Sequence, residues 1–106
     1  MPKYGNRKTM TSDGIVHDSK KEAQRWSELL LMQRAGYIED LRRQVKFELI
    51  PKQDGERACH YIADFVYRDA ITEDVIVEDT KGFETDVYKI KRKLMLWRHG
   101  IKIKQI

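Results

Sequence analysis

The 106-residue sequence has few residues that constrain a chain covalently or conformationally: one cysteine, two prolines and six glycines. The single cysteine, Cys59, excludes an internal disulfide framework and a zinc site built from several cysteines. No apolar run approaches the ~18 residues that a membrane span needs, and none follows the N-terminal Met-Pro-Lys as in an export signal. We therefore expect a soluble cytoplasmic protein with no membrane partner, a basic arm at residues 1–7 and a single domain at residues 8–106.

Charged residues are abundant and unevenly distributed. The 21 lysines and arginines outnumber the 17 aspartates and glutamates, which gives a net charge of +4. Residues 87–106 contain seven bases and no acid, whereas residues 62–86 contain eight acids and two bases. A basic segment favours a polyanionic partner, and an acidic segment repels one unless a cation lies there. The alternative is that both segments are solvated surfaces without a partner.

The first third of the sequence predicts a short hairpin followed by a helix. Asp13-Gly14 is typical of a hairpin turn, and Ser19 is a suitable N-cap for a helix that ends near residue 35. On a helical wheel Glu22 falls on the same side as Trp26, at the N-terminal end of the apolar stripe. A carboxylate is unusual in that position.

Three strands, a second helix and a final strand are predicted for the rest of the chain. The strand-like runs are residues 45–50, 59–67 and 75–81, and the third is β-branched on both faces, as in a central strand. Thr85 or Asp86 can cap a helix that ends near His99, and residues 101–104 alternate as a final strand parallel to the third. After the hairpin the order is α-β-β-β-α-β, which predicts an α/β (α+β) fold with a mixed central sheet flanked by helices.

The second helix has an apolar stripe and a basic face. The stripe comprises Val87, Ile90, Leu94 and Trp97. We expect this stripe, like Trp26, to face the core. The basic face comprises Lys89, Arg92 and Lys93. Together with Lys102 and Lys104, these side chains would follow a phosphate backbone and make binding sensitive to salt.

The second and third predicted strands bring two carboxylates together if they form a hairpin. Pairing Tyr67 with Ile76 places Asp64 opposite Asp79, and strand alternation places Lys81 on the face of Asp79. Opposed like charges in an apolar setting are unstable unless a cation compensates them. Mg²⁺, for which Mn²⁺ can substitute, suits such a site because it binds one or two carboxylates together with water and phosphate oxygens.

These residue types fit phosphodiester hydrolysis, which needs an activated water and stabilisation of charge on the phosphoryl oxygens. Lys81 would orient or deprotonate the water or stabilise the transition state, and Glu22 would complete the metal site from the helix end. Structural roles stay open for each residue: a salt bridge between Asp64 and Lys81, and a capping box at Glu22. A register slip of one residue would turn Glu78 inward in place of Asp79.

Two runs carry a resemblance to a known superfamily. Tyr61-Ile62-Ala63-Asp64-Phe65 and Val77-Glu78-Asp79-Thr80-Lys81-Gly82 resemble the D…(D/E)-x-K core of the PD-(D/E)XK nucleases, with Ala63 where the superfamily name has proline. Tyr4-Gly5-Asn6 and residues 18–23 extend the resemblance, over nearly the whole chain, to a small phage and prophage family. The chain also resembles the phage endonuclease I type of Holliday-junction resolvase, in which a helix glutamate joins the strand acids.

The resemblance implies a restriction-endonuclease-like core, metal binding by Asp64, Asp79 and Glu22, and catalysis by these acids with Lys81. The implied activity is that of a metal-dependent endodeoxyribonuclease, acting on branched DNA such as a Holliday junction in phage recombination or processing. One protomer carries one cleavage site, so we expect a symmetric homodimer.

Further residues are candidates for DNA contact. Lys20 and Lys21 oppose the helix dipole at the start of the first helix, which favours a role facing phosphate, and the basic face of the second helix would add to them. Gln44 and Lys46 are either DNA contacts or a surface strand end. Two other functions stay open: a non-catalytic nucleic-acid-binding module that retains the nuclease fold, and a protein-interaction subunit whose basic face docks on an acidic partner.

Overall fold

A computed structural model of the chain describes residues 8–80 and 83–106. The predicted N-terminal arm, Lys81 and Gly82 lie outside the described residues. The elements are β1 (Thr9–Met10), β2 (Val16–His17), α1 (Lys20–Arg34), β3 (Ile38–Ile50), β4 (Cys59–Asp69), β5 (Val75–Asp79), α2 (Asp86–His99) and β6 (Lys104–Gln105). The predicted hairpin and the α-β-β-β-α-β order that follows it are confirmed.

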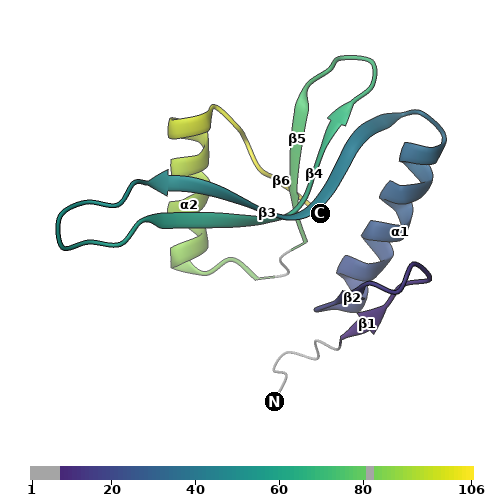
Figure 1. The fold of residues 1–106 in the computed structure, drawn as a ribbon, viewed down its shortest axis with the longest axis horizontal. Helices are drawn as coiled ribbons and strands as arrows, with labels where there is room; N and C mark the ends of the chain where they lie inside the picture. The colour runs from purple at the N-terminus through teal and green to yellow at the C-terminus, as the bar shows by residue number, and fades with distance from the viewer. Residues whose placement is uncertain (1–7, 81–82) are drawn as a thin grey trace.

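Four strands form one mixed sheet in the order β3-β4-β5-β6, and β1 pairs with β2 in a separate hairpin (Figure 1). β3, β4 and β5 are antiparallel neighbours, and α2 carries the chain across so that β6 runs parallel to β5. The register of β4 and β5 pairs Tyr67 with Ile76, as predicted. The chain therefore has a mixed α+β fold.

The helix ends follow the capping residues in the sequence. At the start of α1 the Ser19 hydroxyl accepts the Glu22 N–H at 3.1 Å. At the end of α2 the backbone of Gly100 has a φ of 68°, in the left-handed region that glycine adopts without steric cost. The Trp26 indole N–H donates to the Asp13 carboxylate at 2.6 Å, which holds the N-terminal hairpin against α1. Neither helix of the described residues is long and apolar enough to cross a membrane.

β3 is longer than the sequence indicates, and β6 is shorter. β3 begins at Ile38 instead of Val45, and its first half contains the charged run from Glu39 to Arg43, which hides the alternation of a strand. A bulge at Asp40, where φ is 54°, also breaks the two-residue period there. β6 covers residues 104–105 only, and Ile103 before it is buried in the core.

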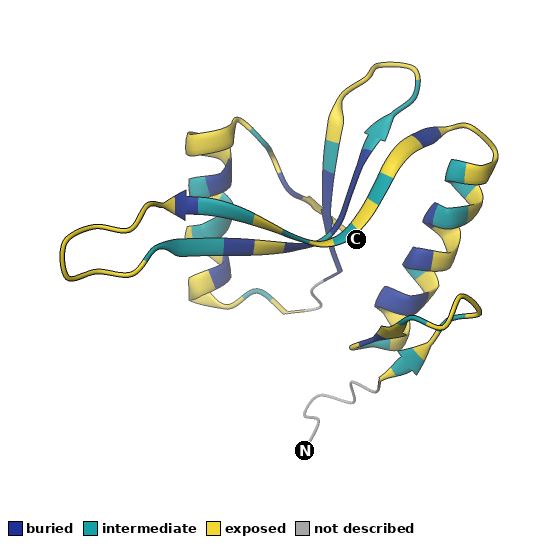
Figure 2. Cartoon of the chain, viewed as in Figure 1, coloured by how far each residue is buried: buried dark blue, intermediate teal, exposed yellow. Residues whose placement is uncertain are grey.

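Two apolar clusters lie on opposite faces of the sheet, one under each helix. The α1 cluster comprises Trp26, Leu29, Ile38, Phe65 and Tyr67. The α2 cluster comprises Leu49, Tyr61, Ala63, Val66, Val77, Tyr88, Met95 and Ile103. Buried residues are concentrated where the strands converge between the two helices (Figure 2).

The β3–β4 ribbon turns over halfway along its length. On β3, Leu41 packs with the α1 cluster and Val45 with the α2 cluster, although strand alternation alone would place both on one face. Gln44 lies at this reversal with a left-handed φ of 54°. On β4, Ala63 packs in the α2 cluster and Phe65 in the α1 cluster, so β4 reverses at the same level, at Asp64. One end of the ribbon therefore packs on α1 and the other on α2, with Gln44 and Asp64 between them.

α2 packs through a different face from the one predicted. The helix begins after Thr85, and it buries Tyr88 and Met95. The predicted stripe lies outside this contact: Val87, Ile90 and Trp97 are exposed and Leu94 is half-buried. The prediction that Trp97 belongs to the core is therefore wrong, whereas that for Trp26 is confirmed. An apolar stripe marks the face that avoids water without identifying the surface that covers it.

Candidate active site

Glu22 is the carboxylate at the centre of a polar cluster where α1 meets the turning point of the β3–β4 ribbon. Its side chain is almost completely buried. One oxygen accepts the Asp18 backbone N–H at 3.1 Å, and the other accepts the Gln44 side-chain amide at 3.1 Å. A capping box would return the carboxylate to the Ser19 N–H, one residue later. The Glu22 carboxylate therefore links the backbone just before the start of α1 to the Gln44 side chain of β3.

Asp64 joins the cluster from β4. Its Oδ2 accepts two hydrogen bonds from Thr80, one from the backbone N–H and one from the hydroxyl, both at 2.8 Å. Its carboxyl group also hydrogen-bonds Glu22. Thr80 directly follows β5, so Asp64 ties the end of β5 to the start of α1.

The Glu22–Asp64 pair has the electrostatics of two acids sharing one site. Burial, and after it the negative charge of Asp64, raise the pKa of Glu22 from its usual 4.5 to about 7. Two carboxyls held this closely cannot both ionise without a compensating cation. The pair therefore holds a proton near neutral pH in the absence of a cation, and a cation would replace that proton.

Gln44 has the only left-handed backbone among the described residues that contact this pair. A non-glycine residue in that region costs about 1–3 kcal/mol and persists where the surrounding structure holds it. The left-handed conformation of Gln44 lets the ribbon turn over beside Asp64, and it directs the Gln44 side-chain amide toward Glu22. Such strain is concentrated at functional sites in proteins.

Asp79, the second predicted strand acid, is buried on β5 and accepts the Tyr61 hydroxyl at 2.7 Å. Extending the β4–β5 register by one residue places it opposite Asp64, as predicted. Burial raises the pKa of the Tyr61 hydroxyl, and the charges of Asp79 and Asp64 raise it further. Burial also raises the pKa of Tyr88 to about 12, again with contributions from Asp79 and Asp64. The charges of Asp64 and Asp79 therefore both raise the pKa of the Tyr61 hydroxyl and that of the Tyr88 hydroxyl.

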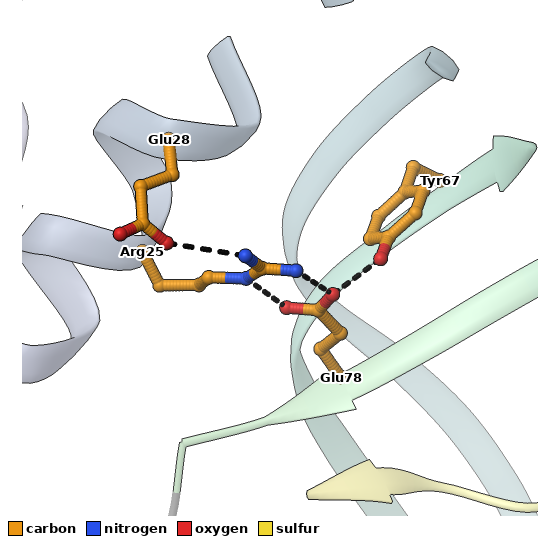
Figure 3. Close-up of polar contacts among 4 residues, drawn as sticks. All are labelled: Arg25, Glu28, Tyr67 and Glu78. Atoms are coloured by element: carbon orange, nitrogen blue, oxygen red, sulfur yellow. Dashed lines mark hydrogen bonds and ion pairs between the residues drawn. The ribbon is translucent and has the colours of Figure 1, made fainter. Parts of the chain in front are cut away.

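Glu78 faces the opposite side of the sheet from Asp79. The register slip of one residue that would exchange these two acids therefore does not occur. Arg25 of α1 donates to its carboxylate through Nε at 2.8 Å and through Nη2 at 2.7 Å, and the Tyr67 hydroxyl is a third donor (Figure 3). The Glu78 side chain is fully buried. Glu78 is therefore the buried anchor of α1, and Asp79 is the acid on the side of Tyr61.

The predicted DNA-contact residues divide into two groups. Lys20 and Lys21 are exposed on the first turn of α1, directly before Glu22. Lys89 and Lys93 are exposed on α2, which covers the other face of the sheet. Arg92 is half-buried and pairs with Glu84 at 2.7 Å, so its guanidinium is already engaged. Of these five basic residues, Lys20 and Lys21 are the ones next to Glu22 in the chain.

The donor set suits a hard divalent cation. Within residues 8–80 and 83–106, no three or more His, Cys, Asp or Glu side chains are grouped closely enough to hold a metal ion by themselves. Mg²⁺ does not need such a cage, because it binds through one or two carboxylates and keeps water or phosphate oxygens as its other ligands. Glu22 and Asp64 are the two oxygen donors that the described contacts bring together, with Asp79 beside them. Lys81 lies outside the described residues.

Some residues of this site cannot be recognised from the sequence. Thr80 stands only between Asp79 and Lys81 of the D-x-K motif, and Tyr61 is one of several residues of a predicted strand. The sequence leaves Gln44 open between a DNA contact and a strand end, because a left-handed backbone leaves no mark in the local pattern.

The raised pKa of Glu22 predicts how the stability of the metal-free protein depends on pH. The folded chain holds the Glu22 proton more tightly than the unfolded chain, so its stability should fall by about 2 kcal/mol as pH rises from 4.5 to about 7. Burial lowers the pKa of His17, which has the opposite effect below pH 6.5. Urea unfolding in a chelator should therefore be compared between the wild type and Glu22→Gln, whose difference isolates Glu22. Parallel pH profiles for the two proteins would contradict the prediction.

Comparisons with known proteins place the chain in a family. A search of curated proteins found no match. A search of solved structures also found none. One family model matches almost the whole length of the chain. On that match, over residues 1–105, the chain belongs to the family DUF1064, described as a protein of unknown function.

Proposed function

We propose that this chain is a metal-dependent endodeoxyribonuclease that hydrolyses phosphodiester bonds. The observation that carries the proposal is the contact between the buried Glu22 and the half-buried Asp64, two acids that a cation between them would stabilise. Asp79 lies beside it on the neighbouring strand. A carboxyl group whose pKa is strongly raised by burial and by a neighbouring acid is typical of a catalytic site.

The residues of the cluster have different roles in the proposed reaction. Asp64, held by two hydrogen bonds from Thr80, and Glu22, held by Gln44, present fixed oxygens to a cation. Mg²⁺ bound there supplies positive charge to the phosphoryl oxygens and lowers the pKa of water. Lys81 follows Thr80 in the chain and is assigned to stabilise the transition state or to orient the attacking water. Lys20 and Lys21 supply phosphate contacts beside Glu22.

The proposal includes a substrate class, a partner and a setting. By its resemblance to the PD-(D/E)XK superfamily and to phage Holliday-junction resolvases, the substrate is branched DNA processed in phage recombination, in the cytoplasm of the host. A four-way junction is resolved by two cuts, so this substrate calls for a homodimer with one site in each copy.

The test is a cleavage assay with the purified chain on a four-way junction, a flap and a linear duplex. We expect cuts that require Mg²⁺ or Mn²⁺ and that favour the branched substrates over the duplex. A protein that leaves all three substrates intact with either metal would contradict the nuclease assignment.

A second candidate function is a non-catalytic nucleic-acid-binding module. It is favoured by the finding that the described residues contain no group of three or more potential metal ligands. Such a module would bind DNA with a strong salt dependence through Lys89 and Lys93, and Asp79→Ala would leave its function in the cell unchanged. If the chain is a nuclease, Asp79→Ala should instead abolish its function in the cell.

A further inference from the structure

A hollow of about 280 Å³ lies on the surface between β4 and the start of α2. His60 and Ile62 line it from β4, and Thr85, Val87 and Lys91 line it from the start of the helix. Ile62, Thr85 and Val87 are exposed, so the hollow is open to solvent. Its volume is close to the lower end of the range of ligand pockets, about 300–1,000 Å³, and suits a ligand the size of one nucleotide.

Two buried tyrosines connect this hollow to the proposed catalytic acids. Tyr61 and Tyr88 line its inner side, and the Tyr61 hydroxyl donates to Asp79 at 2.7 Å. After burial, the charges of Asp79 and Asp64 raise the pKa of both hydroxyls, so both acids lie within electrostatic reach of the hollow. The inner side of the hollow is therefore shared with the residues that surround these acids.

β4 runs from Asp64 directly into the hollow. The residues of β4 that line it are two to four positions from Asp64, which is about 7–13 Å along a strand. β3 pairs with this stretch on one side, and on the side of β5 no strand in the described part of the chain pairs with it. A polymer with one phosphate at the acids can therefore continue along β4 and place its next unit in the hollow.

Lys91 gives the hollow a positive charge. Its side chain is half-buried, and within residues 8–80 and 83–106 no acid forms an ion pair with it. Arg92, the next residue, is by contrast paired with Glu84 at 2.7 Å. The acids that flank this region in the chain, Asp79 and Asp86, do not line the hollow. The hollow therefore favours an anionic group, and phosphate is an anion that lysine binds well.

The rest of the lining is apolar or can donate hydrogen bonds. Ile62 is 52% exposed and Val87 61%, so each offers uncovered apolar surface to a sugar or to the face of a base. The Thr85 hydroxyl accepts the Tyr88 N–H and keeps its own proton to donate. A nucleotide combines an anion, hydrogen-bond acceptors and an apolar ring face, so it matches this lining.

We propose that the hollow holds the nucleotide next to the phosphate that is cut, with Lys91 on the phosphate of that nucleotide and Ile62 and Val87 against its sugar or base. The inference rests on the proposed nuclease function for its substrate, but nucleotide binding can be measured without cleavage. A nucleotide in a single strand or beside a branch enters such a pocket at lower cost than one within a duplex, because fewer pairing and stacking contacts are lost.

Nuclear magnetic resonance of the full chain, titrated with thymidine 5′-monophosphate in a chelator, tests the site without cleavage. The backbone amide signals of residues 60–62 and 85–91 are expected to shift, with a dissociation constant of about 1 mM. Inorganic phosphate alone should shift the signals near Lys91 and leave that of Ile62 unchanged. The proposal would be overturned by shifts confined to other parts of the chain, by the absence of shifts, or by identical shifts with inorganic phosphate.

Ile62→Trp tests whether the hollow itself receives the nucleotide, because the larger side chain fills it. This variant should lose the shifts at residues 85–91. Ile71→Trp is the matched control and should keep them, because Ile71 is exposed in the turn between β4 and β5 and does not line the hollow. Both positions are exposed, so circular dichroism should show an unchanged fold. Equal binding by the two variants would refute the assignment of the nucleotide to this hollow.

Lys91→Gln tests the phosphate contact and separates this inference from the proposed function. It should weaken nucleotide binding about tenfold, and in the cleavage assay it should raise KM about tenfold with kcat within about twofold of the wild type. Lys52→Gln removes the same charge at an exposed lysine between β3 and β4 and should change neither value. Nucleotide binding in the hollow by a chain that cuts no DNA would contradict the nuclease function and support the nucleotide site. Cleavage with an unchanged KM in Lys91→Gln would contradict the site and support the function.

Discussion

Replacing Asp64 with asparagine is expected to lower the rate of metal-dependent cleavage by about 10³-fold or more while leaving the fold intact. Asparagine keeps an oxygen that can accept the two hydrogen bonds from Thr80, so the end of β5 stays in place. What is lost is the negative charge that the proposed site offers to a cation. Single-turnover cleavage of a four-way junction in Mg²⁺ measures this effect.

The matched control is Asp54→Asn, which makes the same change at an exposed aspartate in the turn between β3 and β4. It should cleave at the wild-type rate, and Asp64→Asn should still bind DNA. If Asp64→Asn cleaved within about tenfold of the wild type, this carboxylate would not be part of the catalytic site.

Replacing Arg25 with methionine is expected to destabilise the folded chain by about 3–5 kcal/mol. Methionine preserves much of the packing of the arginine stem but leaves the Glu78 carboxylate, which is fully buried, without its cation. The whole free energy of unfolding of a domain this size is about 5–15 kcal/mol, so leaving the Glu78 carboxylate buried without its cation would remove a large share of it. Urea unfolding at constant m-value measures the change.

The exposed pair of Arg68 and Glu39 is the control for this prediction. It has a similar contact, at 2.6 Å, but both side chains are about half exposed. Arg68→Met should therefore cost less than about 1 kcal/mol, because water solvates the remaining carboxylate. Equal losses for Arg25→Met and Arg68→Met would show that burial does not strengthen the Arg25–Glu78 pair.

The same pair separates structural from catalytic acids on β5. Combining Arg25→Met with Glu78→Gln removes both charges and should recover much of the lost stability, since glutamine can still accept the Tyr67 hydroxyl. Glu78→Gln alone should leave the cleavage rate within a few-fold of the wild type. Loss of cleavage in Glu78→Gln at full stability would assign Glu78 to the site in place of Asp79.

Local patterns were sufficient to predict the parts of the fold that depend on neighbouring residues. The N-cap at Ser19 and the stop at Gly100 follow from side-chain chemistry within one turn of helix. The pairing of Tyr67 with Ile76 follows from two apolar runs joined by a short turn, and it brings Asp64 and Asp79 together. The register therefore follows from the local sequence, whereas the binding of a metal by these acids stays a prediction.

Features that depend on distant contacts could not be predicted in this way. The left-handed backbone of Gln44 results from the ribbon packing on α1 at one end and on α2 at the other. The outward position of Trp97 results from Tyr88 and Met95 occupying the contact with the sheet. Both are decided by which of several apolar surfaces meet, and a single stripe of side chains does not contain that information.

The central claim is that the acids of α1, β4 and β5 together hold a divalent cation. The most direct measurement is a crystal structure of the full chain grown with Mn²⁺, with anomalous diffraction data to locate the metal. The claim predicts an anomalous peak bound by Glu22 and Asp64, with Asp79 adjacent and the Glu22 proton displaced. Well-ordered acid side chains with no peak between them, at a Mn²⁺ concentration that supports cleavage, would contradict it.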